Sequence, residues 1–200
     1  MDRWEQMNDE QLVVLAQSGD AQAFNRLASR WEGSLYGFVR RTLGNEDDAR
    51  DVCQEALLKA YQNIQRLREG AKFKSWIHHI ALNLCRDRFR STKVRGRAVS
   101  IDDTNPEDLE REAPTGAVPR AADGDAEADS LRGLLDQLLG ELPEEQKTCL
   151  LLREYHGFNS EEISQITGAP AATVRTRIFY GLKSVRQAVE RRGLDLADFR

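Results

Sequence analysis

Basic, amide and hydroxyl side chains gather on one side of a helix that the sequence predicts from Ser75 to Phe89. At 100° per residue, one face of this helix is apolar and packs inward, while the opposite face is polar. The outward positions are Ser75, His79, Leu82, Arg86 and Arg90, with Asn83 at the edge. A loop before the helix adds the basic residues Arg66, Arg68, Lys72 and Lys74. Such a surface suits contacts to phosphates and single-stranded bases, although an ordinary solvated face has a similar composition.

A second basic face lies on a long helix predicted from Ala171 to about Arg192. A short helix opening at Ser160 and a tight connection at Gly168 precede it, which is the helix-turn-helix pattern. The inward positions are expected to be Val174, Ile178, Gly181, Leu182, Val185 and Val189. The candidate DNA-contacting positions are Thr173, Arg175, Thr176, Arg177, Phe179, Tyr180 and Lys183. Exposed aromatic side chains next to each other indicate a binding surface. DNA is a suitable partner, because arginine pairs with guanine and threonine or phenylalanine contacts thymine methyl groups.

A third surface is predicted on a helix that begins after Asn45 and runs to about Ile64. Its core side should be formed by Ala49, Val52, Cys53, Ala56, Ala60 and Ile64. The opposite side carries Asp51, Gln54, Glu55 and Leu58, spaced i, i+3, i+4 and i+7. This stripe suits docking onto a basic, amphipathic helix of another protein, while the simpler interpretation is the polar face of a surface helix.

Residue types that carry catalysis do not come together in this chain. The sequence has no phosphate-cradling Gly-rich loop, metal-ligand cluster or nucleophile–base arrangement. His78 and His79 point about 100° apart on a helix and therefore cannot chelate one metal ion. Cys53, Cys85 and Cys149 lie far apart, which supports neither a disulfide framework nor a zinc site. We expect a binding protein that is not an enzyme and that uses no cofactor and no metal.

The elements that position these surfaces are helices almost throughout. Asn8 with Gln11, Asp20, and Asn45 after Gly44 are helix-start signals. We therefore expect an all-α fold of two small helical domains, residues 1–97 and 131–200. No apolar run is long enough for a membrane span and no secretory signal opens the chain, so a cytoplasmic location without membrane insertion is expected.

Residues 98–130 are expected to be a flexible acidic linker. This stretch holds ten Asp and Glu residues against two arginines, although the net charge of the whole chain is only −4. It also contains three of the five prolines. A segment with so few large apolar residues cannot offset its ordering entropy by burial.

Several sequence strings, in order and spacing, resemble the extracytoplasmic-function (ECF) group of bacterial RNA polymerase sigma factors. In the first half they are Asp47-Asp48-Ala49-Arg50-Asp51-Val52-Cys53-Gln54-Glu55-Ala56, Phe73-Lys74-Ser75-Trp76-Ile77 and Ile80-Ala81-Leu82-Asn83. In the second half they are Leu142-Pro143-Glu144-Glu145-Gln146, Glu161-Glu162-Ile163 and Thr173-Val174-Arg175-Thr176-Arg177. The resemblance covers about 160 of the 200 residues.

The resemblance implies roles for the three surfaces. Residues 1–97 look like the family's region 2, and residues 131–200 look like region 4. Asp51, Gln54, Glu55 and Leu58 match positions that dock onto the clamp helices of the polymerase's largest subunit. The loop from Gln65 to Lys74 matches the element that captures a flipped base of the −10 promoter element. Arg175, Thr176, Phe179 and Tyr180 match positions that read the −35 element. Tyr180 departs from the family, which often has a basic residue there, so the −35 sequence is expected to differ.

The same resemblance implies partners and regulation. The expected partners are core RNA polymerase, including the flap of its second-largest subunit, promoter DNA, and an anti-sigma factor. No small-molecule substrate is expected. The acidic linker resembles the segment that threads the polymerase's nucleic-acid channels. The chain would be held inactive until a stress or envelope signal. The competing hypothesis is a helix-turn-helix regulator that acts without core polymerase, which would need neither the Asp51–Leu58 stripe nor an acidic linker.

Overall fold

The computed structural model describes residues 6–99 and 126–193, and every regular element in these ranges is a helix. The first helical group comprises α1 (Asp9–Gln17), α2 (Ala21–Leu43), α3 (Glu46–Asn63) and α4 (Phe73–Val99). Two 3-10 turns, η1 (Ile64–Arg66) and η2 (Gly70–Lys72), connect α3 to α4. The second helical group comprises α5 (Ala126–Gly140), α6 (Glu144–Leu150), the π-helical turn η4 (Leu151–Tyr155), α7 (Ser160–Thr167) and α8 (Ala171–Arg191). The predicted all-α fold is confirmed.

The helices begin where the sequence places capping residues. Asn8 and Gln11 form a reciprocal capping box at α1. At the start of α2, the side chain of Asp20 accepts hydrogen bonds from the backbone N–H groups of Gln22 and Ala23. The side chain of Asn45 accepts the N–H of Asp48 at the start of α3. These side chains satisfy backbone donors that a helix leaves unpaired in its first turn.

The two helices nearest the expected linker are longer than the sequence pattern indicated. Helix α4 continues to Val99, and α5 begins at Ala126 rather than near Ser130. Alanine and glutamate at 126–128 are strong helix formers, which explains the earlier start. The range 98–130 is therefore helical at both ends, and its middle part, 100–125, lies outside the described residues.

The core of the first helical group forms between α2, α3 and α4. The six residues predicted to face inward, five in α3 and Ile64 at the start of η1, are all buried. Phe38 of α2 and Phe73 and Ile77 of α4 are fully buried beside them. Helix α3 therefore has one buried face, and its opposite face is free for other contacts.

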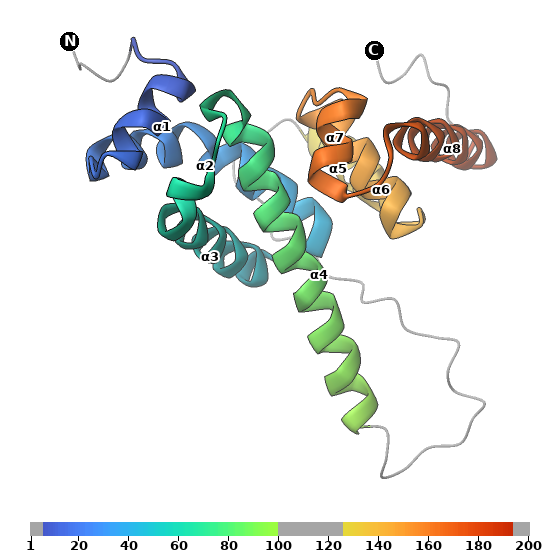
Figure 1. Ribbon diagram of the computed structural model, residues 1–200. Coiled ribbons are helices and arrows are strands. Elements are labelled where there is room, and N and C mark those ends of the chain that lie inside the picture. The colour runs from blue at the N-terminus through green and yellow to red at the C-terminus, as the bar shows by residue number, and fades with distance from the viewer. Residues whose placement is uncertain (1–5, 100–125, 194–200) are drawn as a thin grey trace.

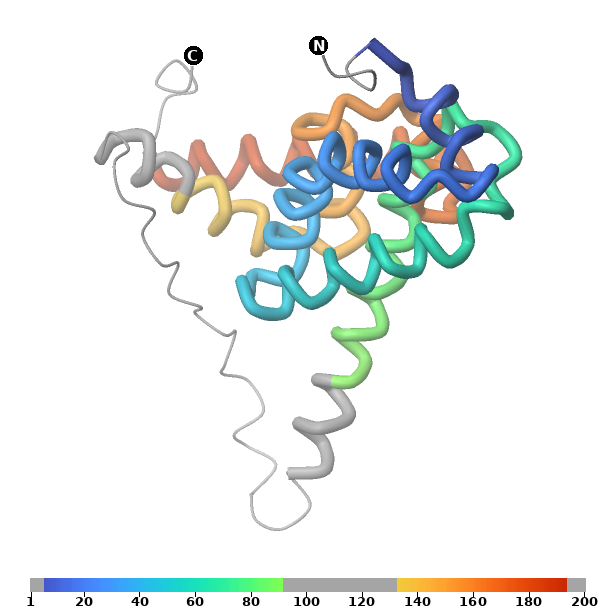
Figure 2. The backbone as a smooth tube through the Cα atoms, turned by 90° about the vertical axis from the view of Figure 1, so that its left-hand side faces the viewer, coloured from blue at the N-terminus to red at the C-terminus, as the bar shows by residue number. Residues whose placement is uncertain are grey.

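The two helical groups pack against each other. Figures 1 and 2 show α4 running beside the second helical group, where it contacts α7, while α2 contacts η4. Apolar side chains of both groups belong to one continuous buried cluster. An aromatic contact lies at its centre, because the ring of His78 is 5.0 Å from Phe158 and 5.3 Å from His156. This packing determines which predicted surfaces stay accessible.

Candidate nucleic-acid and polymerase interfaces

The outer face of α3 carries the predicted protein-docking stripe, which we call the α3 stripe: Asp51, Gln54, Glu55 and Leu58. All four residues are exposed, and Leu58 keeps 54% of its surface accessible. Glu55 forms an ion pair with Lys59 at 2.9 Å, and Asp51 lies 3.8 Å from Arg88 of α4. The structure thus presents an apolar side chain among carboxylates and an amide on one rigid helix.

The loop between α3 and α4 is fixed by α1. The side-chain amide of Gln17 donates to the carbonyl oxygens of Ile64 at 2.9 Å and Leu67 at 2.8 Å. Gly70 lies directly against the backbone of Glu10. These contacts leave the three basic residues of the loop, Arg66, Arg68 and Lys72, exposed to solvent. Lys72 also pairs with Glu69 at 2.8 Å. The loop is therefore a braced, cationic edge.

The outer face of α4 differs from the expectation at two positions. Ser75 and Leu82 were expected to face outward, yet they are only 6% and 2% exposed. The hydroxyl of Ser75 donates to the carbonyl oxygen of Lys72 at 3.0 Å, inside the turn that starts the helix. Leu82 is buried at the interface with the second helical group, beside Thr148 and Thr167. The helical pattern identifies the face correctly but does not reveal that another part of the chain covers it.

Backbone carbonyl oxygens of the second helical group accept hydrogen bonds from Lys74, in the first turn of α4, and from His79 and Arg86 of the outer face. The pairs are Lys74 with His156 at 2.6 Å, His79 with Ile166 at 2.8 Å, and Arg86 with Thr167 at 3.2 Å. Asn83 and Arg90 remain exposed. Asn83 lies 3.0 Å from the second ring nitrogen of His79, and Arg90 pairs with Asp87 at 3.5 Å. Some of the candidate −10 residues are thus accessible, in the loop and at Asn83 and Arg90, whereas the others on α4 are covered or bonded to the second helical group.

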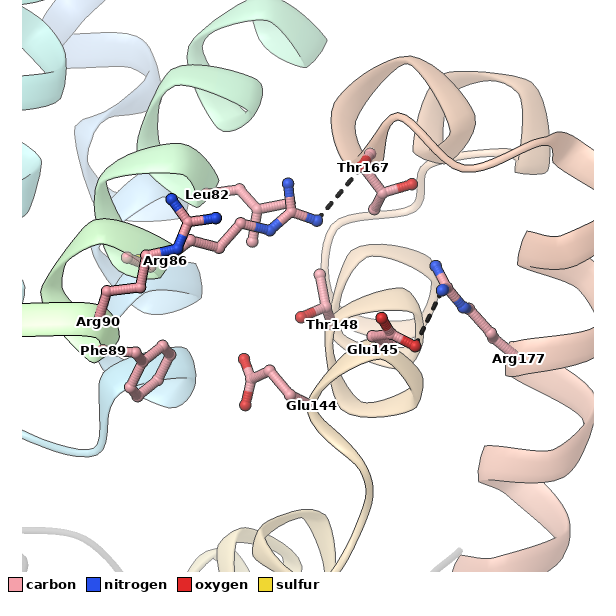
Figure 3. Close-up of a pocket in the computed structure, with 10 residues that line it drawn as sticks. Leu82, Arg86, Phe89, Arg90, Glu144, Glu145, Thr148, Thr167 and Arg177 are labelled. Atoms are coloured by element: carbon pink, nitrogen blue, oxygen red, sulfur yellow. Dashed lines mark hydrogen bonds and ion pairs between the residues drawn. The ribbon is translucent and has the colours of Figure 1, made fainter. Parts of the chain in front are cut away.

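A cavity of about 320 Å³ lies between α4 and the second helical group (Figure 3). Its lining residues are Leu82, Cys85, Arg86, Phe89, Arg90, Glu144, Glu145, Thr148, Thr167 and Arg177. Burial raises the pKa of the Glu144 carboxyl, despite the nearby charges of Lys147 and Arg86. Figure 3 shows Arg86 reaching across to Thr167, while Arg177 turns to Glu145 at 2.9 Å. The cavity is a gap between the two groups, lined by both signs of charge.

The face of α8 is accessible as predicted. Phe179 and Tyr180 are 63% and 50% exposed and contact each other edge to face, with ring centroids 5.4 Å apart. The other exposed candidates are Thr173, Arg175, Thr176 and Lys183, and Arg177 is half-buried through its ion pair with Glu145. Arg175 lies 3.5 Å from Glu161 of α7.

Leu182 is a correction on the same helix, because it is 48% exposed instead of packing inward. It lies at the margin of the inward stripe, next to Gly181, which is buried against α6. The close packing of α8 on α6 requires glycine at 181, since a Cβ atom there would lie 2.8 Å from Cδ1 of Leu150.

The aromatic seat between the two helical groups was not identified from the sequence. We define it by Phe38, His78, His156 and Phe158. His78 is fully buried, and its position three and seven residues before Ala81 and Cys85 places it on the inward stripe of α4. This spacing could have indicated from the sequence that His78 is buried. No local pattern indicates that His156 packs beside it, because His156 lies far along the chain.

The cysteines and the metal-ligating residue types of the described ranges do not form clusters. Among residues 6–99 and 126–193, no group of His, Cys, Asp and Glu side chains is arranged to hold a metal ion. All three cysteines are buried and free. No helix in the same ranges is both long and apolar enough to cross a membrane.

Comparison with known families agrees with this geometry. The Sigma-70 region 2 family matches residues 27–95, and the Sigma-70 region 4 family matches residues 132–185. The first match covers the α3 stripe, the loop and most of α4, and the second covers α7 and most of α8. A regulator that acts without polymerase does not explain the match to region 2, so the competing hypothesis is set aside.

Curated relatives and solved structures extend over nearly the whole chain. RNA polymerase sigma-H factor of Pseudomonas aeruginosa is 31% identical over 92% of this chain and 95% of its own length. ECF RNA polymerase sigma-E factor of Haemophilus influenzae is 32% identical over 93% and 97%. CnrH, solved with the cytosolic domain of CnrY, shares the fold with a TM-score of 0.68 at 20% identity, over 92% of this chain and 97% of that one. The sigma factor RpoE of Bartonella quintana, solved with the anti-sigma factor NepR, has a TM-score of 0.67 at 20% identity, over 85% and 98%. The chain belongs to the ECF group of RNA polymerase sigma factors, which are transcription initiation factors and not enzymes.

Proposed function

We propose that this sigma factor engages core polymerase and promoter DNA through three separate surfaces. The α3 stripe binds the clamp helices of the largest subunit, the loop and the face of α4 bind the −10 element, and α8 reads the −35 element. The second helical group also contacts the flap of the second-largest subunit. The observation that carries the proposal is the α3 stripe, whose four side chains are exposed while the opposite face of the helix is fully buried.

Polymerase docking through the α3 stripe follows from its composition. Leu58 offers an apolar anchor at the C-terminal end of the stripe, and Asp51 and Glu55 offer carboxylates to a basic partner helix. Anchors that are rigid before binding lose little side-chain freedom on association. Helix packing against the core supplies this rigidity, because Val52 and Ala56 are buried on the other side.

Promoter opening at the −10 element requires that a base leave the stack and enter a protein pocket. The loop from Gln65 to Lys74 supports this role because α1 holds it in place and its basic residues Arg66, Arg68 and Lys72 remain exposed. A pocket that is formed in advance offsets the unstacking cost of a few kcal/mol. Cationic side chains along α4 would then follow the phosphates of the separated strand.

Recognition at the −35 element is supported by the exposed face of α8. The side chain of Arg175 is 59% exposed, and arginine is the residue that most often pairs with guanine in the major groove. Phe179 and Tyr180 form an exposed apolar pair that suits thymine methyl groups. Tyr180 stands where family members often have a basic residue, so the −35 sequence that this sigma factor prefers should differ from that of its relatives.

An anti-sigma factor holds this chain inactive in our proposal until a stress or envelope signal releases it. Support comes from the two structural neighbours, one solved with the anti-sigma factor NepR and the other with the cytosolic domain of CnrY. Affinity capture of the chain from unstressed cells should recover such a partner. Recovery of polymerase alone would contradict this part of the proposal.

Run-off transcription tests the polymerase surface. Core polymerase and fragments of the source genome are combined with the wild-type chain or with a Gln54→Ala, Glu55→Ala double variant. Specific transcripts should require the chain and disappear with the double variant. The matched control is Gln22→Ala with Glu32→Ala, which makes the same two chemical changes at exposed positions of α2. Full transcription by the Gln54/Glu55 variant would overturn the assignment of the α3 stripe.

A further inference from the structure

Two arginines of α8 that the sequence pattern assigns to DNA, Arg175 and Arg177, have different surroundings. They are two residues apart and therefore point to nearly opposite sides of the helix. The side chain of Arg175 is 59% exposed and lies 3.5 Å from Glu161 of α7. The side chain of Arg177 is only 24% exposed, and its guanidinium pairs with Glu145 of α6 at 2.9 Å. The placement of Arg177 therefore favours a role within the protein over a contact to DNA.

The guanidinium of Arg177 contacts two side chains that lie one turn apart on α6. Besides Glu145, it forms a hydrogen bond with the thiol of Cys149, which is fully buried. Residues four apart in a helix lie on the same face, so the two contacts follow the length of α6. Figure 3 shows Arg177 turning from α8 toward Glu145, at the edge of the cavity. One side chain thus joins α8 to a full turn of α6.

A second contact between α6 and α8 lies one turn farther along α8, at Gly181. A Cβ atom on this residue would lie 2.8 Å from Cδ1 of Leu150 and 3.6 Å from Cβ of Gln146, so the backbone of α8 comes directly against α6. A single contact fixes the separation of two helices but lets them pivot. Two contacts one turn apart also fix the angle between them. Arg177 and Gly181 together therefore determine how α8 is tilted on α6.

The tilt of α8 decides which of its side chains reach base edges in the major groove. An arginine reads guanine through two parallel hydrogen bonds, which depend on the direction of the side chain as well as on its distance. Binding groups of this kind must be held within about 0.5 Å and 10–20° of the productive geometry. Arg175 and Phe179 are one turn apart on α8, so a change of tilt would displace them by different amounts.

We propose that Arg177 is a positioning residue for the −35 element and does not itself contact DNA. Its bonds to Glu145 and Cys149, with the close packing at Gly181, hold α8 at the angle at which Arg175 reaches the bases. The inference rests on the proposed −35 role of α8. It also assigns a supporting role in DNA recognition to Glu145, although acidic side chains repel the phosphates of DNA.

Measurement of sequence discrimination by the reconstituted holoenzyme tests this role. The wild-type holoenzyme first selects its preferred −35 sequence from promoter fragments with a randomised upstream element. The Kd of each variant holoenzyme is then measured on a fragment with that sequence and on a fragment with the −35 element scrambled. The ratio of the two Kd values gives the discrimination, and the dependence of log Kd on log salt concentration reports the number of phosphate contacts.

Arg177→Ala and Glu145→Ala should each lower the discrimination about fivefold to tenfold, in the lower part of the range for loss of one arginine–base pair. Neither should change the salt dependence. The double variant should lose no more than Arg177→Ala alone, because both substitutions break the same bond. Exchange of the two residues, Arg177→Glu with Glu145→Arg, should restore most of the discrimination.

Matched controls remove the same charges elsewhere in the second helical group. Arg186→Ala on α8 and Glu154→Ala on η4 are at exposed positions and should leave the discrimination unchanged. Thermal unfolding shows that each variant is folded. The side chain of Glu145 is 68% exposed, so its substitution leaves the core intact and keeps the test valid even where Arg177→Ala lowers stability.

A DNA contact by Arg177 would give the opposite pattern. Arg177→Ala would then weaken binding to both fragments equally and reduce the salt slope by about 1. Glu145→Ala would release the arginine and tighten binding, with the discrimination unchanged. Either result would overturn the positioning role, and an exchanged pair without recovery would contradict the part of the ion pair.

Arg175→Ala distinguishes failure of this inference from failure of the proposed function. Unchanged discrimination in Arg175→Ala would show that α8 does not read the −35 element as proposed. A loss in Arg175→Ala without any loss in Arg177→Ala or Glu145→Ala would overturn the positioning role alone.

Discussion

Gly70, in the turn before α4, lies so close to α1 that a Cβ atom would be 2.9 Å from Cα of Glu10. The obstructing atoms belong to backbone as well as side chain, so they cannot rotate away. The loop that carries Arg66, Arg68 and Lys72 is therefore positioned by the absence of a side chain at one residue.

Gly70→Ala should lower the free energy of unfolding by about 1–3 kcal/mol, the usual cost of forcing an added group into a packed site. It should also reduce promoter opening, since the loop must shift away from α1. Urea denaturation and permanganate footprinting of the −10 region measure the two effects. Gly33→Ala is the control, because a Cβ atom there meets nothing within 4 Å. In the middle of α2 it should stabilise the protein by about 0.5–1 kcal/mol.

Arg175→Ala should weaken discrimination at one base pair of the −35 element by about 1–3 kcal/mol. Its ion pair with Glu161 is exposed, so thermal stability should stay nearly unchanged. Selection of promoter sequences by the reconstituted holoenzyme would show relaxed preference at one position. Arg186→Ala, also exposed on α8 but beyond the predicted contacts, should leave the selected sequence intact. Equal effects of the two variants would argue against base readout by Arg175.

Acid should loosen the contact between the two helical groups. Burial lowers the pKa of His78 from 6.5 to about 3 and that of His156 to about 4. The ring of His78 faces the backbone carbonyl oxygen of Lys74 and the rings of Phe38, Phe158 and His156, while His156 faces Ser34, Arg41 and Lys74. The Nε2 atoms of both histidines are buried and have no hydrogen-bond partner. Protonation would therefore place charge beside two cations, with no acceptor.

The sign of the pH effect follows from these lowered pKa values. Between pH 6.5 and about 4 the unfolded chain binds more protons than the folded chain, so stability falls as the pH decreases. From pH 7.5 to pH 5, the free energy of unfolding should drop by about 1–2 kcal/mol for each histidine. His156→Gln should have a shallower pH dependence in urea denaturation. A slope equal to that of wild type would contradict the contribution of His156.

The buried cysteines should resist oxidation and alkylation in the folded protein. Burial raises the pKa of both Cys53 and Cys85 to about 12, and it also raises the pKa of Cys149. Only the thiolate reacts readily, and a raised pKa lowers the fraction of thiolate at neutral pH. Mass spectrometry after brief treatment with iodoacetamide should find no adduct on the native chain and three adducts in denaturant. Fast native labelling of Cys85 would indicate that the contact between the helical groups opens often.

Local sequence patterns were sufficient for the helices and for most of the candidate surfaces. The caps at Asn8, Asp20 and Asn45, the buried stripe of α3 and the exposed pair Phe179 and Tyr180 depend on residues within a few turns. Helical periodicity places such residues on a face without knowledge of the rest of the chain. The combination of motifs likewise pointed to the sigma family.

The sequence by itself determined which face of α4 is polar, but only the tertiary structure decided what that face touches. Leu82 is buried, and His79 bonds to Ile166, because α7 packs on α4 from a distant part of the chain. No local spacing encodes a contact between residues so far apart. It arises from the fit of Phe158 and His156 around His78, which is a property of the assembled core.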